Sequence, residues 1–457
     1  MALDKLVDST QLDADLTSVA NAIRTKGGTS ASLAFPAGFV QAIGDIPSGG
    51  GGDGIPILKD VVFIDYDGTI VEQYTKAEFL ALDSMPANPS HSGLTAQGWN
   101  WSLADAKTYV TANGMLVVGQ NYKTTDDKTK IYITIPDNLL GRKFCLIFIA
   151  SVKNGVTIDW GDGNTEVSTG NANADSTHTH TYAASGDYII SLSATSGTYI
   201  LGSTSSLYGL FGRNSGDGSR PDVMRNCVTK IETSKDVTGI NTLGGSGDYS
   251  AYFDNCTDII LSKSVQTLGT NRLFVKKLSL RTIIVPEGAQ FTGSSNQIMD
   301  FSSNVLFCSL PKSCNVYPNL IDNAGNYKLL MCTMPETAEN RGRMFYGMSN
   351  LQKACIPGTY TAMGANMYRA AETLRSVTIP AFVTSVAQFS VYPMDNIREY
   401  HFLPTTPPTL ASTSNMFTVN ANVKIYVPYS ADHSILNAYQ TASNWTSFAS
   451  YIEEEPQ

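Results

Sequence analysis

A short apolar run that ends in proline recurs at nearly constant spacing through the second half of the chain. Seven such runs, 22 to 25 residues apart, end at Pro286, Pro311, Pro335, Pro357, Pro380, Pro404 and Pro428. Two further runs without the proline lie around Ser262 and Ser234. Each run is long enough for one strand, and proline ends it because proline cannot donate to a strand ladder. The repeat predicts a solenoid whose turns bury their apolar sides against their neighbours.

Composition also favours a protein rich in strands and turns. Charged residues make up only 16% of the 457 residues, and 38 residues are glycine. The chain is too long for one ordinary core, so we expect a mainly β, multidomain protein. Its net charge of −9 makes nucleic acid and anionic membranes poor partners. No apolar run reaches the about 18 residues of a membrane span, and the first residues lack the pattern of a secretory signal.

The 7 cysteines are scattered without the paired spacing of a zinc site. Their odd number and the missing signal pattern predict reduced and mostly buried thiols in a protein completed in the cytoplasm. The nearest pair has no neighbouring histidine, so no metal site is predicted from them. The cysteines are Cys145, Cys227, Cys256, Cys308, Cys314, Cys332 and Cys355.

Residues 1–47 carry two short amphipathic helical patterns, the first ending at Gly27 and the second covering 35–46. Such short helices cannot form a stable core alone, so we expect their apolar faces to dock on a partner. Residues 48–54 are rich in glycine and predict a flexible linker. The run "VANAIRTKGGTSASLAFPAGFVQAI" resembles the N-terminal region of tail proteins from phages and prophages of Gram-positive bacteria. The resemblance implies attachment to the tail or baseplate.

Residues 55–127 predict a small α+β domain that contains "VVFIDYDGTIV". Asp65 and Asp67 in this run resemble the nucleophile and the acid/base of haloacid-dehalogenase-type phosphatases, which also hold Mg²⁺. That chemistry needs a doubly wound parallel sheet, and the chain after residue 113 has too few helical patterns to build one. We therefore favour a hairpin that turns at Asp67 and Gly68. Helices are expected over 75–82 and 102–113.

Apolar and polar residues alternate through 128–196, which predicts a two-sheet β-sandwich. The expected strands are 130–135, 143–150, 156–160 and 187–194. "WGDG" at 160–163 and "HTYAASGDYIISL" at 180–192 resemble the two signatures of PKD-type immunoglobulin-like domains, which implies a spacer or weak adhesion module. His178 and His180 alternate along one strand, as metal ligands would, but the resemblance gives His180 a packing and hydrogen-bonding role.

The repeats from 197 to 428 also carry a resemblance. Residues 374–386 are similar to the BspA-like leucine-rich repeats of bacterial surface and phage proteins, although many other rungs depart from that pattern. The segment 429–457 resembles the closing helix of that family. Its apolar residues would cap the open end of the solenoid. These residues are Leu436, Tyr439, Trp445, Phe448 and Ile452.

The loops 244–255 and 339–350 mix aromatic residues with Asn, Asp and Gly, a composition typical of an adaptable binding surface. The candidate surface-binding residues there and nearby are Tyr249, Tyr252, Phe345, Tyr346, Tyr360 and Tyr368. No G-x-S-x-G elbow locates a Ser-His-Asp triad, and no pair of carboxylates is distinctive enough to predict glycan cleavage. We therefore predict no catalytic residue, no cofactor and no metal ligand.

The order of segments, with its resemblances, implies a non-enzymatic structural and host-recognition component of a phage tail. The N-terminal residues would attach to the tail or baseplate, and the solenoid would bind a glycan or protein of the bacterial surface. We expect a homo-oligomer, with a trimer as one option, located in the virion tail after assembly in the host cytoplasm. A bacterial surface adhesin and a tail-associated glycan depolymerase are the alternatives, and the missing signal pattern argues against the adhesin.

Overall fold

The computed structural model of the protein is mainly β with few helices. The structure describes residues 17, 57–137, 142–204, 210–211, 226–241, 243, 255–269, 279–292, 304–314, 328–335, 345–354, 361–369 and 371–456. The chain divides into two compact units, Met1–Leu58 and Lys59–Gln457. The predictions for 1–47 and for the linker 48–54 lie outside the described residues, apart from Thr17.

Residues 59–127, called the docking region below, contain a four-stranded sheet with strand order β2-β1-β4-β3. Strand β1 pairs antiparallel with β2 and parallel with β4. The elements of this region are β1 Val61–Ile64, β2 Ile70–Tyr74, α3 Lys76–Leu80, β3 Leu94–Trp99, α4 Leu103–Asn113 and β4 Leu116–Thr124.

The hairpin predicted around Asp67 and Gly68 is confirmed. The Asp65 N–H donates to the Thr69 carbonyl over 2.9 Å, and the chain turns at Gly68 with a φ of +89°. This left-handed conformation is accessible to glycine at no steric cost. The turn is therefore determined by the local Asp-Gly pair.

Both predicted helices of the docking region are also confirmed. Helix α3 begins after Thr75, whose hydroxyl accepts from the Glu78 N–H while the Glu78 side chain accepts from the Thr75 N–H. This reciprocal capping satisfies two donors at the helix start. Helix α4 starts after Ser102, which accepts from the Asp105 N–H, and it ends at the left-handed Gly114.

A set of mostly antiparallel strands follows the docking region. The four strands expected from alternation are present, two more lie among them, and a seventh follows. The set is β5 Thr129–Ile135, β6 Lys143–Ala150, β7 Val156–Asp159, β8 Thr165–Val167, β9 Asp175–Thr181, β10 Gly186–Ala194 and β11 Tyr199–Leu201.

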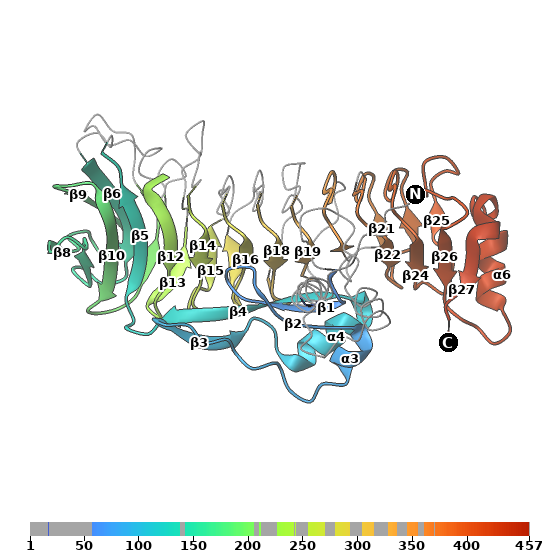
Figure 1. Cartoon of the computed structure of the whole chain (residues 1–457), viewed down its shortest axis with the longest axis horizontal. Helices are drawn as coiled ribbons and strands as arrows, with labels where there is room; N and C mark the ends of the chain where they lie inside the picture. Colours follow the sequence, from blue (N-terminus) through green and yellow to red (C-terminus); the bar gives the residue numbers. More distant parts are fainter. Residues whose placement is uncertain are drawn as a thin grey trace, which may run out of the picture. The chain divides into compact units, whose positions relative to one another are not determined.

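The rest of the chain forms a β-solenoid of about seven turns, so the solenoid predicted from the repeat is confirmed. All nine apolar runs form strands, and these strands make up the rung face (Figure 1). The rung face contains β12 Val228–Glu232, β14 Asp258–Ile260, β16 Thr282–Ile284, β18 Phe307–Ser309, β19 Met331–Thr333, β20 Lys353–Ala354, β22 Ser376–Ile379, β24 Glu399–Phe402 and β26 Lys424–Val427. The second face contains β13 Val237–Ile240, β15 Thr267–Gly269, β17 Gln290–Thr292, β21 Ala362–Met363, β23 Ser385–Val386 and β25 Thr409–Leu410.

The two sheets of the antiparallel strands continue directly into the solenoid. Strand β12 pairs antiparallel with β5 on one side and parallel with β14 on the other. Strand β11 likewise joins β6 to β13. One hydrophobic core extends from Ile131 to Ile452. Both sheets thus cross the predicted boundary between the sandwich, which ends at residue 196, and the solenoid, which begins at 197. The antiparallel strands cover the first open end of the solenoid.

The other end of the solenoid is closed by the segment that begins at Ser434 and is described up to Pro456. The predicted closing helix is present only in part, because the chain forms α6 Ser434–Thr441, a 3-10 helix η2 Trp445–Tyr451 and a strand β27 Ile452–Glu454. The break falls at Asn444, whose φ is +66°. Strand β27 adds to β26 in parallel as the last rung. The predicted capping role is confirmed, since four of the five predicted side chains are buried and Leu436 packs against the core.

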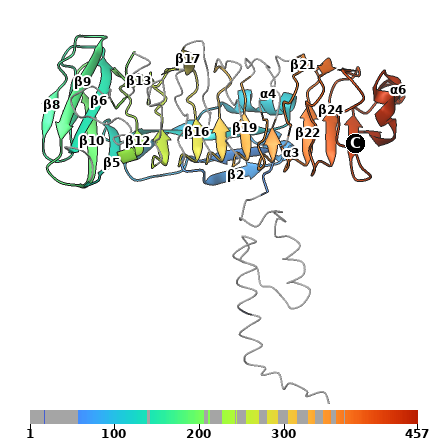
Figure 2. The ribbon, with the colours of Figure 1, turned by 90° about the horizontal axis from the view of Figure 1, so that it is seen from above.

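Strand β4 runs along the solenoid axis and crosses the strands of the rung face (Figures 1 and 2). The Val117 N–H donates to Thr333 Oγ1 over 2.6 Å, and the Ser309 hydroxyl donates to the Val117 carbonyl over 2.8 Å. Further along β4, Asn121 Nδ2 donates to the Leu261 carbonyl over 3.3 Å. The backbone comes so close at Gly119 that a Cβ there would lie 2.5 Å from the Ile284 side chain. Successive residues of β4 therefore contact successive coils.

The burial predicted for the cysteines is confirmed for the six that the structure describes, and Cys355 lies outside the described residues. Burial raises the pKa of the Cys227 thiol to about 11. Within the described ranges, no helix has the length and apolar character needed to span a membrane.

Candidate recognition surface

The two aspartates that resemble a phosphatase motif stabilise the docked hairpin. Asp65 is 3% exposed, and its carboxylate accepts from the Tyr122 hydroxyl over 2.9 Å and from the Tyr66 N–H over 2.7 Å. The His91 ring lies 2.6 Å from its other oxygen. The Asp67 carboxylate accepts from the Thr69 N–H inside the turn. Both carboxylates are engaged in local contacts, and burial together with Asp65 raises the pKa of Tyr122.

The turn of this hairpin rests on the rung face. The Lys230 ammonium lies 5.1 Å from the centre of the Tyr66 ring, and the Thr282 hydroxyl donates to the Tyr66 carbonyl. Burial opposes the charge of Lys230, but the Glu232 carboxylate 2.7 Å away outweighs it and raises the Lys230 pKa. Burial also raises the pKa of Asp258 on the next strand. The hairpin turn therefore contacts the start of the solenoid through the Tyr66 ring and carbonyl, and Glu232 holds the Lys230 ammonium near that ring.

The residues of the "WGDG" and "HTY" signatures lie together between the antiparallel strands. The His180 ring stacks on Trp160 at 5.0 Å and lies 2.7 Å from the Asp162 carboxylate. The Tyr182 hydroxyl donates to the Trp160 carbonyl over 2.9 Å. The packing role expected for His180 is confirmed by these contacts. Among the described residues, no group of His, Cys, Asp and Glu is placed to hold a metal ion.

A serine, a histidine and a glutamate are aligned in a way that sequence reasoning missed. Ser176 Oγ lies 2.6 Å from His178 Nε2, and His178 Nδ1 lies 2.9 Å from Glu166 Oε1. The sequence shows that Ser176 and His178 lie two positions apart and so face the same side of one strand. Nothing in the sequence shows that Glu166 of β8 lies beside them. Ser176 is only 4% exposed, and its hydroxyl already accepts from the Gly170 N–H over 3.2 Å. The three residues therefore tie β8, β9 and the loop between them together.

Two of the six predicted surface-binding residues belong to the core. The Phe345 and Tyr368 side chains are fully buried and stack on each other at 5.2 Å, with 15° between their planes. The prediction that they form a surface is wrong, because both occupy the inward position of their coils. Composition identified the loop but not which of its residues face inward. Tyr249, Tyr252 and Tyr360 lie outside the described residues.

Tyr346 is half-buried and belongs to a stack of side chains at the edge of the solenoid. The Arg369 guanidinium lies 5.9 Å from the Tyr346 ring centre and 5.1 Å from the Phe389 ring centre. The Phe389 and Tyr392 rings are 6.3 Å apart. Tyr346, Arg369, Phe389 and Tyr392 are called the edge stack below. All four side chains are half-buried, so each keeps an exposed part.

The coil register explains why these side chains gather. The Phe345 N–H donates to the Met367 carbonyl and the Tyr368 N–H to the Ser390 carbonyl, each over 2.8 Å. The inward residues Phe345, Tyr368 and Val391 thus lie at the same level of three successive coils. The residue that follows each of them points away from the core and begins or continues the edge stack.

Phe389 occupies a backbone conformation that its neighbours in the adjacent coils fill with asparagine. The φ angles of Asn366, Phe389 and Asn415 are +64°, +62° and +56°, and each residue lies two positions before an inward residue. Asparagine tolerates this left-handed region, whereas a phenylalanine there costs about 1 to 3 kcal/mol. Such strain is typical of binding sites, where the surrounding structure maintains it.

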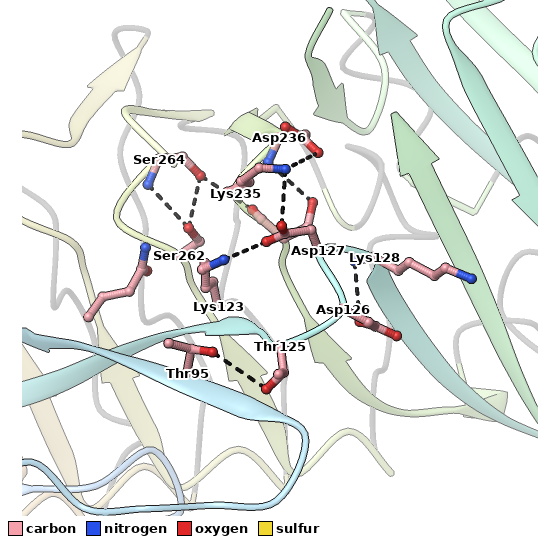
Figure 3. Close-up of polar contacts among 12 residues, drawn as sticks. Thr95, Lys123, Thr125, Asp126, Asp127, Lys128, Lys235, Asp236, Ser262 and Ser264 are labelled. Atoms are coloured by element: carbon pink, nitrogen blue, oxygen red, sulfur yellow. Dashed lines mark hydrogen bonds and ion pairs between the residues drawn. The ribbon is translucent and has the colours of Figure 1, made fainter. Parts of the chain in front are cut away.

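A second polar cluster lies where β4 passes into β5 (Figure 3). Asp127 pairs with Lys123 at 2.5 Å and with Lys235 at 3.2 Å, and Lys235 also pairs with Asp236 at 3.3 Å. The Lys123 ammonium is the main cause of the lowered pKa of Asp127. Opposite charges pair within this cluster, so it fastens the end of the docking region rather than presenting unpaired charge to a ligand.

Comparison with known proteins adds no identity: no family model matches the chain, and no curated protein matches it significantly.

Proposed function

We propose that this protein is a non-enzymatic structural and host-recognition component of a phage tail, and that its solenoid binds the bacterial cell surface. The observation that carries the proposal is the edge stack, which presents three aromatic side chains and an arginine from successive coils. Aromatic and arginine side chains dominate the binding energy of recognition surfaces. The solenoid is closed at both ends and shares one core, so it is a rigid support for such a surface.

We also propose an identity for each part of the chain and an oligomeric state. The contacts among Trp160, Asp162, His180 and Tyr182 support a PKD-like sandwich, which would act as a spacer at the start of the solenoid. The parallel coils ending in proline support repeats of the BspA-like leucine-rich type. Residues 1–47 would attach the protein to the tail or baseplate. A homo-oligomer, for example a trimer, would multiply the avidity of a weak single site.

Binding of the labelled full-length protein to a panel of Gram-positive bacteria tests the proposal. We expect binding to some strains and its loss after the surface polysaccharide of those strains is removed. If the protein bound none of the strains, the proposed function would be contradicted. Immunogold labelling of phage particles tests the location, and a native protein found on host cells but never in virions would favour the adhesin.

A tail enzyme that acts on the surface glycan is the second candidate, and the alignment of Ser176, His178 and Glu166 is the observation that favours it. A Ser-His-Glu arrangement hydrolyses an ester, such as an acetyl group on a sugar, whereas cleavage of the glycosidic bond by a depolymerase uses two carboxylates. Incubation with purified surface polysaccharide separates the two functions. Release of acetate by the wild type but not by Ser176→Ala would establish a glycan esterase, and release of reducing ends would establish the depolymerase. We expect no release from either protein, because the Ser176 hydroxyl is buried.

A further inference from the structure

We infer that the edge stack binds an anionic polysaccharide, with sugar rings against the aromatic faces and a carboxylate or phosphate on Arg369. The inference rests on the proposed function and names the site and the class of ligand. Arg369 lies in the middle of the stack, between the Tyr346 and Phe389 rings.

The guanidinium of Arg369 is held in place but keeps donors for a ligand. Its Nη1 donates to the Asn366 side-chain oxygen over 3.0 Å. Arg369 forms no ion pair with any residue that the structure describes. A guanidinium has five N–H donors in a planar fork that matches a carboxylate or a phosphate. An arginine that lies beside two rings and has no ion-pair partner among the described residues therefore offers a preformed anion site.

The rings of the edge stack favour a polymer of sugars over a small anion. They come from neighbouring coils, which follow one another at roughly 4.8 Å. Tyr346 lies on one side of Arg369, and Phe389 with Tyr392 lies on the other. Flat aromatic faces pack against the C–H faces of sugar rings, while the tyrosine hydroxyls accept and donate hydrogen bonds. A chain of sugars laid along the axis would contact all of them.

The charge of the protein argues that the anion must be bound locally. The chain carries a net charge of −9, so an anionic polymer is not attracted by the molecule as a whole. A neutral glycan on the stack would cover the Arg369 guanidinium without pairing it, and burying an unpaired charge is unfavourable. An anionic group on the ligand removes this cost.

The strained Phe389 gives an independent reason to place a ligand here. Both neighbouring coils use asparagine at the same left-handed position. The Phe389 side chain is only half-buried, and it is not one of the partly buried apolar side chains that pack against the core. We therefore attribute the strain to a role of the exposed ring. In the structure the Phe389 ring lies against the Arg369 guanidinium.

The test uses the full-length protein and three soluble polymers of similar length. Polygalacturonate oligosaccharides carry a carboxylate on each sugar, phosphomannan carries phosphate, and dextran is neutral. We expect binding to at least one of the two anionic polymers, weakening as salt is added, and no binding to dextran. The anionic polymer that binds more tightly shows whether the site prefers a carboxylate or a phosphate. If neither anionic polymer binds, or if dextran binds as tightly as they do, the inference is overturned.

Three substitutions locate the site. Arg369→Met is expected to weaken binding by about tenfold or more, because the paired anion loses its charge-assisted hydrogen bonds. Phe389→Asn restores the residue of the neighbouring coils, so it should fold as well as the wild type and still bind more weakly. Arg398→Met is the matched control, since Arg398 is an exposed arginine of the solenoid outside the stack. Thermal melting confirms that all three variants fold.

The same variants keep this inference separate from the proposed function. If bacteria bind the wild type, Arg369→Met and Phe389→Asn equally, the proposed function stands and the edge stack is not the site. If no bacterium binds any version but the anionic polymers distinguish the variants, the site stands and host recognition does not. Equal polymer binding by the wild type and both stack variants would refute the site.

Discussion

The coils of the solenoid and the docking region 59–127 are held by different kinds of contact. Neighbouring coils join through parallel strands with the same register, as in the pairing of Thr282 with Phe307 and of Phe307 with Met331. The docking region instead contacts the rung face through single, non-repeated polar groups. Asn100 alone donates to the Val285 carbonyl over 2.9 Å and to Ser309 Oγ over 3.0 Å, and it accepts from the Gly119 N–H.

This difference determines how each region responds to damage. A coil contacts mainly its two neighbours, so a defect at an end loosens the adjacent coils first. The docking strand β4 contacts several coils at once, from Thr333 back to Leu261. A defect there removes a support shared by these coils. Damage to an end and damage to β4 should therefore spread differently along the solenoid.

Removal of the indole at the closed end of the solenoid is expected to cost most. Trp445 is fully buried, packs 4.9 Å from Phe402 and donates to the Pro408 carbonyl over 2.8 Å. Trp445→Ala should lower the free energy of unfolding by about 3 to 5 kcal/mol, since it opens a large cavity. Chemical denaturation measures the loss. Hydrogen exchange should increase in β26 and β24 before it increases in β12.

The exposed Tyr429 is the control for this variant. It is 45% exposed and lies between β26 and α6, so Tyr429→Ala should change stability by less than about 0.5 kcal/mol. If Trp445→Ala increased exchange equally in every coil, the end would not behave as a separate neighbour-dependent cap. The contrast with the docking region would then be lost.

Asn100→Ala probes the docking region and is expected to have the next largest effect. The buried amide satisfies carbonyls on two coils and the Gly119 N–H of β4. Its removal takes this partner from the Val285 carbonyl and from the Gly119 N–H, while the Ser309 carbonyl keeps the Val285 N–H as a donor. We expect a cost of about 2 to 3 kcal/mol. Hydrogen exchange should increase both in β4 and in β16 and β18. Asn422→Ala, at an exposed asparagine, is the control, and an effect confined to β4 would contradict the shared support.

Local signals were sufficient to predict most elements but not how they assemble. The Asp67-Gly68 turn, the cap at Thr75 and the proline-terminated rungs each depend on residues close in sequence. The contacts of Asn100 with Ser309 and of Tyr109 with Met334 join residues 209 and 225 positions apart, and no pattern in the chain marks them. The continuation of β5 into β12 is equally non-local.

The edge stack, too, could be predicted only in part from local sequence. The aromatic loop around Tyr346 was identified by composition, but Phe345 beside it is a core residue. The two differ only in the direction of their side chains, which depends on the register with the next coil. Arg369 and Phe389 were missed because neither lies in an aromatic loop, and the coil register alone brings them to Tyr346.

Acid is expected to distinguish the antiparallel strands from the docking contacts around Asn100, which do not titrate. Burial lowers the pKa of His178 below its ordinary value, with Glu166 acting in the opposite direction. The unfolded chain therefore binds a proton more readily than the folded chain as the pH falls below the ordinary histidine value of about 6.5. Stability should be constant above that pH and decrease below it.

Melting temperatures between about pH 7.5 and 5 measure this dependence around the histidine pKa. His178→Gln should be less stable overall but should lose less stability as the pH decreases. Its side chain faces Ser176, Glu166 and the Phe148 ring, and of these only Glu166 titrates. Asn422→Ala, at an exposed residue that does not titrate, is the control and should retain the wild-type dependence. An unchanged pH dependence in His178→Gln would refute the assignment.

The ion pairs at the end of β4 are expected to contribute least (Figure 3). The Lys235 and Asp127 side chains are 51% and 35% exposed, so water and salt screen their attraction. A double-mutant cycle of Lys235→Ala and Asp127→Asn should give a coupling energy below about 1 kcal/mol that decreases with added salt. Because the pKa of Asp127 is lowered, its contribution should be present at neutral pH and lost as the pH falls below about 4. A salt-independent coupling of several kcal/mol would mean that charge, rather than the buried amide of Asn100, holds the docking region on the solenoid.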